Sequence, residues 1–196
     1  IEPVKNLVLE SSFSYRTLSS ASSEFKLDYF TDNSYTTTSN KITQSEVNFL
    51  INYTPKRKMV GYGVDRIDVD LNYPRFFVSY SQGLKGVFDS DFNYSKLQLY
   101  YRQPLLIGGF GRLFSTLEIG KTFGAVPLSL MGIIPGNQSY FIIDNTYNLL
   151  NYYDFVADQY TSLHLEHNFN GKLFARVPLL RKLNWREIIG VKAVYG

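Results

Sequence analysis

The chain has 196 residues, of which 44% are hydrophobic, 16% aromatic and 19% charged, and its formal net charge is +3. This composition is too rich in apolar residues for a disordered protein, and the length fits one domain. The absence of Cys excludes disulfides and thiolate chemistry, the mildly basic balance makes nucleic acid a weak candidate as a partner, and no apolar stretch approaches the roughly 20 residues of a transmembrane helix.

Apolar residues recur at every second position along most of the chain, which is typical of β-strands. The clearest run is Arg66–Tyr73, in which Ile67 and Val69 alternate with Asp68 and Asp70. In chain order, the pattern predicts strands at residues 7–15, 25–29, 46–53, 66–73, 76–82, 95–102, 112–119, 140–145, 162–169 and 186–195. Connections rich in Gly, Pro, Asp, Ser or Lys are expected at 19–23, 31–40, 55–63, 83–90 and 103–111. We therefore expect about ten strands in one all-β unit over residues 1–196.

The alternation leaves open which face of the strands meets water. In a soluble sandwich or lipocalin-like barrel the apolar face is buried in a core, whereas in a membrane barrel it faces lipid. Several segments alternate over about eight to ten residues, close to the 9–11 that cross a bilayer. Aromatic residues near strand ends are candidates for interfacial girdles: Tyr53, Tyr73, Tyr101 and Phe169. Length and aromatic placement favour an antiparallel up-and-down transmembrane β-barrel.

Three longer segments carry a family resemblance. They are residues 74–97 (PRFFVSYSQGLKGVFDSDFNYSKL), residues 134–160 with IPGNQSY and NLLNYYDFVADQY, and residues 169–187 with FNG and VPLLRKLNWRE. These segments resemble a family of large Bacteroidetes outer-membrane proteins that join an amino-terminal carboxypeptidase-regulatory-like domain to a carboxy-terminal barrel. The resemblance implies that the chain is a C-terminal portion of a larger barrel, without the regulatory-like domain. The family barrel is distantly similar to surface-antigen barrels that insert or secrete other outer-membrane proteins.

The longest interruption of the strand pattern lies at about residues 121–160, where Pro127, Pro135 and several Gly and Asn occur. Long ordered loops on barrels often carry function. The sequence leaves open whether this loop stays at the surface or folds into the lumen. If it enters the lumen, its polar residues are expected to meet wall charges such as Arg102 or Arg112. Those loop residues are Asn137, Gln138, Asn148, Asn151 and Asp154.

A basic and apolar segment follows at about residues 171–185. Pro178 is suited to the first position of a short helix, in which leucines at 179, 180 and 183 share one face. Such a helix suits the headgroup level of a membrane, with Arg181, Lys182 and Trp185 at the interface. A packed connecting turn is the alternative interpretation.

Few residue patterns point to catalysis. His164 and His167 flank Glu166, but a strand places His164 and Glu166 on one face and His167 on the other, which argues against a metal site. Gly108–Gly111 lacks the Lys-Ser/Thr of a phosphate-binding loop and suits a hairpin turn. We therefore predict no catalytic residue, no cofactor and no metal.

The leading functional hypothesis is a noncatalytic outer-membrane β-barrel segment that acts in envelope transport, assembly or surface structure. Its expected partners are outer-membrane lipids or lipopolysaccharide and other envelope proteins, and no nucleic acid. An outer-membrane hydrolase is one alternative, with His164 and Glu166 as its candidate residues. A soluble β-barrel or sandwich that binds a ligand is the other.

Overall fold

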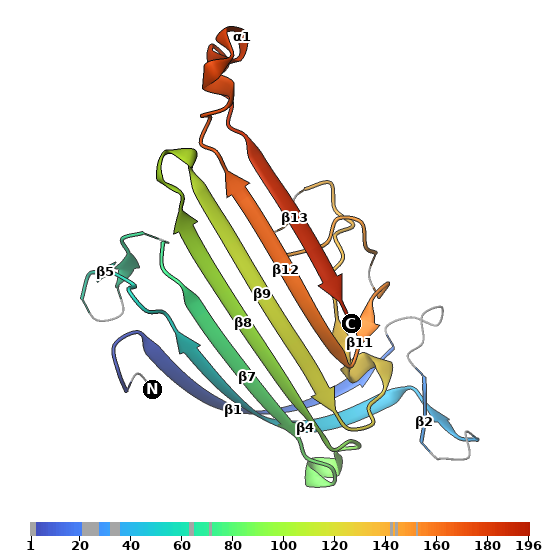
Figure 1. Ribbon diagram of the computed structural model, residues 1–196. Helices are drawn as coiled ribbons and strands as arrows, with labels where there is room; N and C mark the ends of the chain where they lie inside the picture. The colour runs from blue at the N-terminus through green and yellow to red at the C-terminus, as the bar shows by residue number, and fades with distance from the viewer. Residues whose placement is uncertain are drawn as a thin grey trace.

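The computed structural model describes residues 3–20, 28–31, 36–62, 65–70, 72–141, 143, 145–151 and 153–196. Seven long strands form one curved antiparallel sheet (Figure 1). They are β1 (Leu7–Ser19), β4 (Lys41–Tyr53), β7 (Arg75–Gly83), β8 (Tyr94–Leu106), β9 (Arg112–Phe123), β12 (Gln159–Asn168) and β13 (Ile188–Tyr195). The sheet order is β1-β4-β7-β8-β9-β12-β13, so each long strand pairs with the next one along the chain. The predicted all-β, antiparallel, up-and-down arrangement is confirmed, and the described strands form an open sheet with β1 and β13 at its edges.

Short elements occupy the connections. Three two-stranded ladders pair β2 (Tyr29–Phe30) with β3 (Thr38–Ser39), β5 (Met59–Val60) with β6 (Ile67–Asp68), and β10 (Gly132–Ile133) with β11 (Val156–Ala157). Single 3-10 turns are η1 (Val87–Asp89), η2 (Gly108–Phe110), η3 (Leu128–Leu130) and η4 (Phe174–Arg176). The α-helix α1 (Pro178–Arg181) lies beyond the ends of β12 and β13 (Figure 1).

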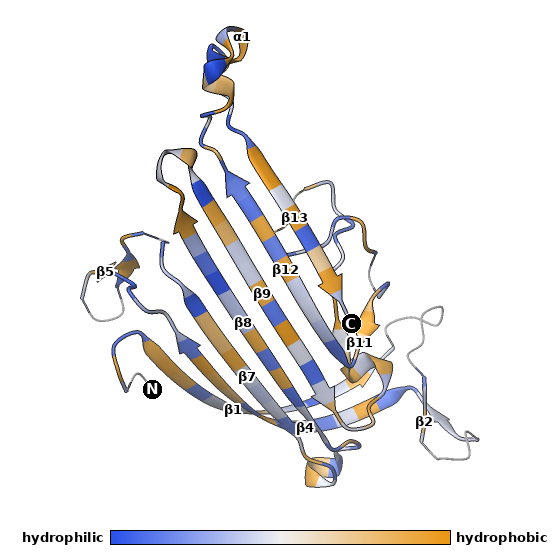
Figure 2. Cartoon of the chain, in the orientation of Figure 1, coloured by the Kyte–Doolittle hydropathy of each residue, from blue (hydrophilic) through white to orange (hydrophobic). Residues whose placement is uncertain are grey.

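The strand register gives the sheet two chemically different faces, visible as alternating colours along the strands in Figure 2. Tyr53, Phe76 and Tyr101 are register partners on β4, β7 and β8, and their side chains share one face. We call this the apolar face; its larger members are Leu7, Leu9, Phe13, Tyr15, Val47, Phe49, Ile51, Tyr53, Phe76, Val78, Tyr80, Leu97, Leu99, Tyr101, Leu105, Leu113, Leu117, Ile119, Phe123, Leu163, Leu165, Ile189, Val191 and Tyr195. The other side, the polar face, carries Arg16, Gln44, Glu46, Asn48, Ser81, Lys96, Gln98, Arg102, Arg112, Thr116, Glu118, Ser162, His164, Glu166 and Lys192.

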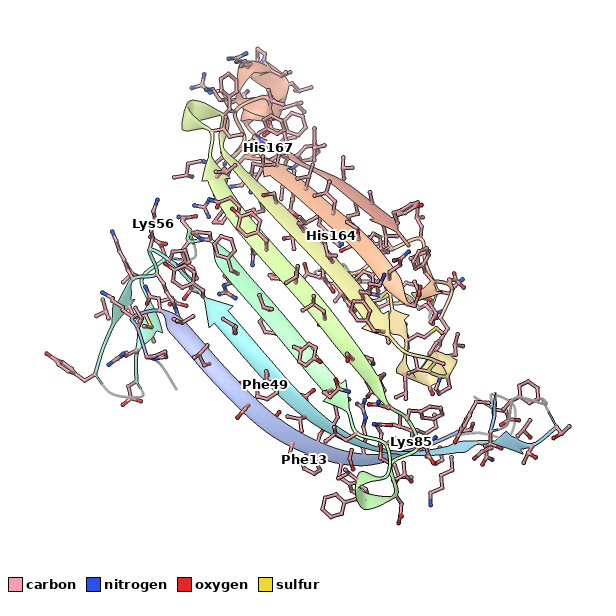
Figure 3. All side chains as sticks on the ribbon, turned by 60° about the horizontal axis from the view of Figure 1, so that its bottom comes forward. Phe13, Phe49, Lys56, Lys85, His164 and His167 are labelled. Carbon is pink, nitrogen blue, oxygen red and sulfur yellow. The ribbon has the colours of Figure 1, made fainter. Side chains whose placement is uncertain are left out.

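The apolar face is the more exposed of the two. Phe13 and Phe49, labelled on β1 and β4 in Figure 3, are 51% and 50% exposed, and Leu99 in the middle of the sheet is 38% exposed. The small core lies on the opposite side, where Ile42 and Tyr94 pack against Leu130. The usual distribution of a soluble β-protein, with apolar side chains inside and polar ones outside, is therefore inverted across this sheet.

Two predicted strands and one predicted turn are wrong. Among the described residues of this segment, 66–70 and 72–73, only Ile67–Asp68 is in a strand, and the Asp70 carboxylate accepts the backbone N–H of Asn72 at 2.8 Å, a contact typical of turns. The described residues of segment 140–145 contain no strand. The turn expected at 103–111 is shorter, since β8 continues through Pro104, where β7 has ended and β9 is the only neighbour.

Other predicted elements change in length. The strand expected at 25–29 falls mostly outside the described residues, and its end, Tyr29, begins β2. The strand expected at 46–53 begins earlier, at Lys41, and the strand expected at 7–15 continues to Ser19. Both extensions are mostly polar, and their apolar residues, Leu18 and Ile42, are register partners in the β1–β4 ladder and pack in the small core on the polar face.

Candidate functional site

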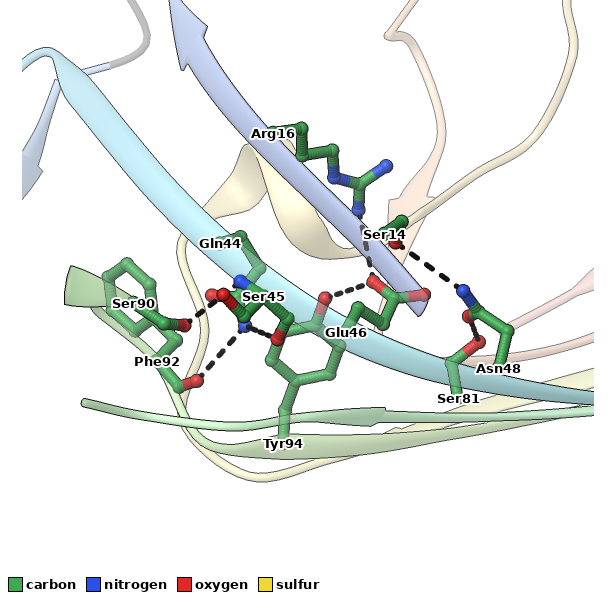
Figure 4. A network of polar contacts seen from close by, with 10 residues as sticks. All are labelled: Ser14, Arg16, Gln44, Ser45, Glu46, Asn48, Ser81, Ser90, Phe92 and Tyr94. Carbon is green, nitrogen blue, oxygen red and sulfur yellow. Dashed lines mark hydrogen bonds and ion pairs between the residues drawn. The ribbon is translucent and has the colours of Figure 1, made fainter. Parts of the chain in front are cut away.

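The polar face is the part of the molecule in which functional groups converge. One cluster surrounds Glu46 on β4 (Figure 4). The Tyr94 hydroxyl of β8 donates to Glu46 Oε2 at 2.6 Å, and Arg16 Nη2 of β1 lies 3.2 Å from the same oxygen. Glu46 is 8% exposed, so a phenol and a guanidinium replace much of the water that an ionised carboxylate needs. Farther along the same face, Ser81 donates to Asn48 Oδ1 at 2.6 Å. These contacts join four neighbouring strands.

A second cluster surrounds Glu118 on β9. The Tyr160 hydroxyl of β12 donates to Glu118 Oε1 at 2.5 Å, and Gln98 Nε2 of β8 donates to the same oxygen at 2.7 Å. The Tyr160 ring lies over Gly120, where a Cβ atom would be 2.2 Å from the ring. Glycine is therefore required at position 120 for tyrosine to lie flat across the neighbouring strand.

The Glu46 cluster is built in the same way. Tyr94 lies over its register partner Gly83, where a Cβ atom would be 2.6 Å from the ring. The ring crosses β7 and brings its hydroxyl to Glu46 on β4. Tyrosine opposite glycine thus occurs twice on the polar face, each time with a buried or half-buried carboxylate as the acceptor. The sequence reasoning missed both tyrosines, although Tyr94 and Tyr160 interrupt the polar side of their strands.

The connection from β9 to β12, residues 124–158, lies against the polar face, and we call it the docked loop. Leu130 of this loop is 1% exposed and packs against Ile42 and Tyr94. Farther along the loop, the Tyr147 ring meets the His164 ring edge-on at 4.8 Å, and its hydroxyl donates to the backbone oxygen of Ala193 at 2.9 Å. The loop is therefore fixed to strands near both ends of the sheet.

A cation and a phenol reinforce the second attachment. Lys192 Nζ of β13 donates to the backbone oxygen of Thr146 at 2.8 Å. Burial raises the pKa of Tyr147, which further disfavours the phenolate. The loop thus contacts β12 and β13 of the sheet through the ring and hydroxyl of Tyr147 and the backbone carbonyl of Thr146.

The loop residues expected to meet wall arginines bond within the loop instead, so that part of the prediction is wrong. Asn137 Nδ2 donates to Asn148 Oδ1 at 3.1 Å, Gln138 Nε2 donates to Asn151 Oδ1 at 3.2 Å, and Asn151 Nδ2 donates to Asp154 Oδ2 at 3.0 Å. These amides shape the loop's own turns because short polar side chains bond readily to nearby groups. Contacts with the wall come from Leu130 and Tyr147.

His164 and Glu166 lie on the polar face and line one cavity of about 150 Å³ with Arg102, Thr116 and Lys192. Figure 3 labels His164 and His167 along β12. His167 is on the apolar face, where its Nε2 lies 2.9 Å from the backbone oxygen of Phe110. Within the described ranges, no group of three or more His, Asp or Glu side chains is arranged to hold a metal ion.

Two of the four aromatic residues predicted as girdle candidates lie on the apolar face. Tyr53 and Tyr101 flank Phe76 on the apolar face, with ring centroids 6.2 and 4.6 Å from that of Phe76. Tyr73 is different, because it is 2% exposed and its hydroxyl donates to Asp68 at 2.9 Å. Phe169 packs beside His167, 4.2 Å between ring centroids.

The connection from β12 to β13, residues 169–187, is called the basic connection. Pro178 is at the start of α1, and Leu179 is 77% exposed. The Phe169 backbone N–H donates to the Glu187 backbone oxygen at 3.0 Å, which joins the two ends of the connection, and the Phe174 backbone N–H donates to the Glu187 carboxylate. Trp185 is 56% exposed, so the connection presents both cations and apolar side chains to its surroundings.

No described helix has the length and apolar character needed to cross a membrane.

Comparisons with known proteins give one match. No curated protein and no solved structure matches the chain. The model of one protein family matches residues 3–196, and its description is "Family of unknown function (DUF5686) C-terminal domain". Because the match spans nearly the whole sequence, the chain belongs to this family of unknown function and corresponds to its C-terminal domain.

Proposed function

We propose that the chain forms part of the wall of a bacterial outer-membrane β-barrel with a noncatalytic role in envelope transport, assembly or surface structure. The observation that carries the proposal is the exposed apolar face. Phe49 and Ile51 on β4 are 50% and 44% exposed although they sit in the interior of a long strand. Extended exposed apolar surfaces mark a membrane or a protein interface. Lipid acyl chains are the surroundings that this face suits.

Strand length supports a membrane span. β1, β4 and β8 have 13 residues each, β9 has 12 and β12 has 10. A tilted strand needs about 9–11 residues to cross the hydrocarbon layer, whereas strands of soluble proteins average about 5–6.

The apolar band also runs obliquely across the sheet. On β1 it extends to Tyr15, one row beyond Phe13, and the row of Phe13 passes through Ser95 of β8 to Phe123 of β9. On β12 it ends at Leu163, because Gln159 and its register partner Lys121 follow on the same face. Strands tilted to the membrane normal produce such a drift, since a band of constant depth must cut across the rows of paired residues.

The polar face supports a lumen. Glu46 and Glu118 accept hydrogen bonds from Tyr94 and Tyr160, and such satisfied polar groups are expected where a barrel interior is partly filled. The docked loop fills part of the same side through Leu130 and Tyr147. The proposed lumen is therefore constricted by a segment of the wall protein itself.

The edges of the sheet and the family resemblance support a larger barrel. Among the described strands, β1 and β13 each have one long neighbour. Further strands added at both edges complete a closed wall, because open edges are not tolerated in hydrocarbon. The resemblance to Bacteroidetes outer-membrane proteins with a regulatory-like domain fits this assignment. The proposed partners are outer-membrane lipid or lipopolysaccharide at the apolar face and envelope proteins at the ends.

Cysteine labelling tests the proposal cleanly because the chain has no Cys of its own. Leu99→Cys and Gln98→Cys place single thiols on adjacent residues of β8, on the apolar and polar faces respectively. In envelopes that contain the full protein, a lipid-soluble maleimide is expected to label Leu99→Cys, and a charged maleimide is expected to label only Gln98→Cys. If the charged reagent labels Leu99→Cys as fast as Gln98→Cys, the apolar face meets water and the proposal is wrong.

A further inference from the structure

Three cations converge on one cavity at the end of the polar face. Arg112 of β9, Lys172 of the basic connection and Arg186 just before β13 line a cavity of about 480 Å³. Asn168 and Asn170 line it as well, and no carboxylate of the described residues does. Arg112 is the register partner of both Leu106 and Asn168, so this cavity opens on the polar face.

Aromatic rings hold two of these cations in place. The Lys172 ammonium lies 4.0 Å from the centroid of the Phe110 ring, and the Arg112 guanidinium lies 5.6 Å from that of Phe114. A cation over a ring face is attracted by the ring but keeps its hydrogen-bond donors for another partner. Arg102, on the neighbouring strand β8, lies 5.2 Å from the centroid of the same Phe114 ring.

The turn from β8 to β9 provides room for the lysine. A Cβ atom at Gly109 would lie 2.7 Å from Lys172 Nζ. At Gly111, where φ is 98°, a Cβ atom would lie 2.0 Å from the backbone oxygen of Asn168. The Gly108–Gly111 segment therefore makes a tight turn and also lets the basic connection approach it closely.

The positive charge of this cavity is not balanced by ion pairs. The ion pairs among the residues that the structure describes are Arg16 with Glu46 and Arg57 with Asp68. Glu187, the neighbour of Arg186 in sequence, is 7% exposed; its Oε1 accepts the backbone N–H of Phe174, and its Oε2 has no hydrogen-bond partner among the described residues. On the adjoining part of the polar face, Glu166 lines the neighbouring cavity with Arg102 and Lys192.

We propose that this cavity binds a phosphate group. Arginine guanidinium pairs with phosphate oxygens through two parallel N–H donors. A phosphate monoester carries about −1.5 to −2 charge at pH 7, whereas a carboxylate ligand carries only one negative charge. Three cations are therefore better matched by a phosphate than by a carboxylate. The cavity exceeds the size of a lone phosphate and lies in the range of small-molecule sites, about 300–1,000 Å³. The group therefore belongs to a larger phosphorylated molecule, either a soluble one or a lipid headgroup.

The phosphate site adds a ligand to the proposed function. It rests on that function in one respect, because the cavity lies inside a lumen only if the sheet is part of a barrel. That position favours a soluble phosphorylated ligand. Binding itself is measured on the detergent-solubilised full protein, whatever surrounds the apolar face. A failure of phosphate binding and a failure of the membrane assignment are therefore separate results.

The test measures binding of inorganic pyrophosphate by calorimetry, and of vesicles of phosphatidylglycerol or phosphatidylcholine by flotation. The variant Arg112→Gln with Lys172→Gln is compared with Arg176→Gln, which removes one charge from the same connection without touching the cavity. Arg186→Gln is included as a single substitution because its side chain is exposed, so that little packing is lost.

At least a tenfold loss of pyrophosphate affinity in the double variant and in Arg186→Gln, with less than a twofold change in Arg176→Gln, supports a site for a soluble phosphorylated ligand. The same pattern with phosphatidylglycerol vesicles alone supports a lipid headgroup as the source. Equal losses in the cavity variants and Arg176→Gln, or no loss in either assay, overturn the proposal.

Discussion

The two faces of the sheet are formed by the same strands but differ in both polarity and burial. On the apolar face, Phe49 and Leu99 stay exposed and lack an overlying layer among the described residues. On the polar face, Glu46 is buried and bonded, and the docked loop supplies the apolar contacts through Leu130. The comparison shows that the buried side chains of the sheet lie on its polar face, whereas those on its apolar face are exposed.

The largest expected effect comes from loosening the docked loop. Leu130→Ala is expected to lower the free energy of unfolding by about 2–5 kcal/mol, because it removes a fully buried side chain and leaves a cavity against Ile42 and Tyr94. The measurement is urea unfolding of the protein in lipid vesicles. Leu128→Ala, in the same turn but 48% exposed, is the control and is expected to change little. Equal effects of the two substitutions would show that the loop is not held by the polar face.

A charged residue placed on the apolar face distinguishes lipid from water as the surroundings of that face. Leu99→Arg is expected to cost about 2–4 kcal/mol of free energy of unfolding in a bilayer, which is the penalty for arginine at mid-depth on the lipid side of a barrel. Gln98→Arg, on the polar face next to Glu118, is the matched control and should be tolerated. The same unfolding measurement compares them. A cost below about 0.5 kcal/mol for Leu99→Arg is what exposed surface in water gives, and it would contradict the lipid assignment.

The hydroxyl groups of the two faces provide a finer comparison. Tyr160→Phe removes the donor to Glu118 Oε1 and is expected to lower the free energy of unfolding by about 1.5–3 kcal/mol, as for a hydrogen bond to a charged group. Tyr80→Phe removes a hydroxyl on the apolar face that bonds Gln82, and its expected cost is smaller, near zero. Unfolding midpoints in vesicles measure both. A larger loss of unfolding free energy in Tyr80→Phe than in Tyr160→Phe would contradict the expectation that hydroxyl groups stabilise the polar face more than the apolar face.

The smallest effect concerns the β5–β6 ladder outside the sheet. The hydrogen bond from Arg57 to Asp68, 2.6 Å long, lowers the pKa of Asp68 below its usual value. A carboxyl whose folded pKa is depressed stabilises the fold above its unfolded pKa, about 3.9, and this stabilisation is lost as pH falls through the lower folded pKa. The protection of the Val60 amide against hydrogen exchange, relative to an unstructured amide at the same pH, should therefore fall below about pH 4. In Arg57→Gln this pH dependence should be much weaker; an unchanged profile would exclude the ion pair as its cause.

The sequence predicted the long strands well because alternation is a local signal. The seven long strands overlap seven predicted segments, and the failure at residues 66–73 has a specific cause. There, Ile67 and Val69 alternate with aspartates, but Asp68 pairs with Arg57 and the Asp70 carboxylate accepts the backbone N–H of Asn72. Polar spacing in a structured loop imitated the pattern of a strand.

The polar-face contacts were not predictable in the same way because they are long-range. Leu130 meets Ile42 and Tyr94, and Tyr147 meets His164 and Ala193, none of which is near it in sequence. The loop's many Asn residues drew attention to polar contacts with the wall, whereas its few large apolar and aromatic residues make the attachment.

The docked loop has a consequence for the order of assembly. Its first anchor, Leu130, needs β4 and β8, which precede it in the chain, but Tyr147 and Thr146 take partners from Ala193 and Lys192 of β13. Nearest-neighbour strands can pair successively as the chain becomes available. The loop, however, cannot complete its contacts until the last described strand is in place. Full protection of the loop is thus a late event, and it records that the preceding strands of the sheet have paired.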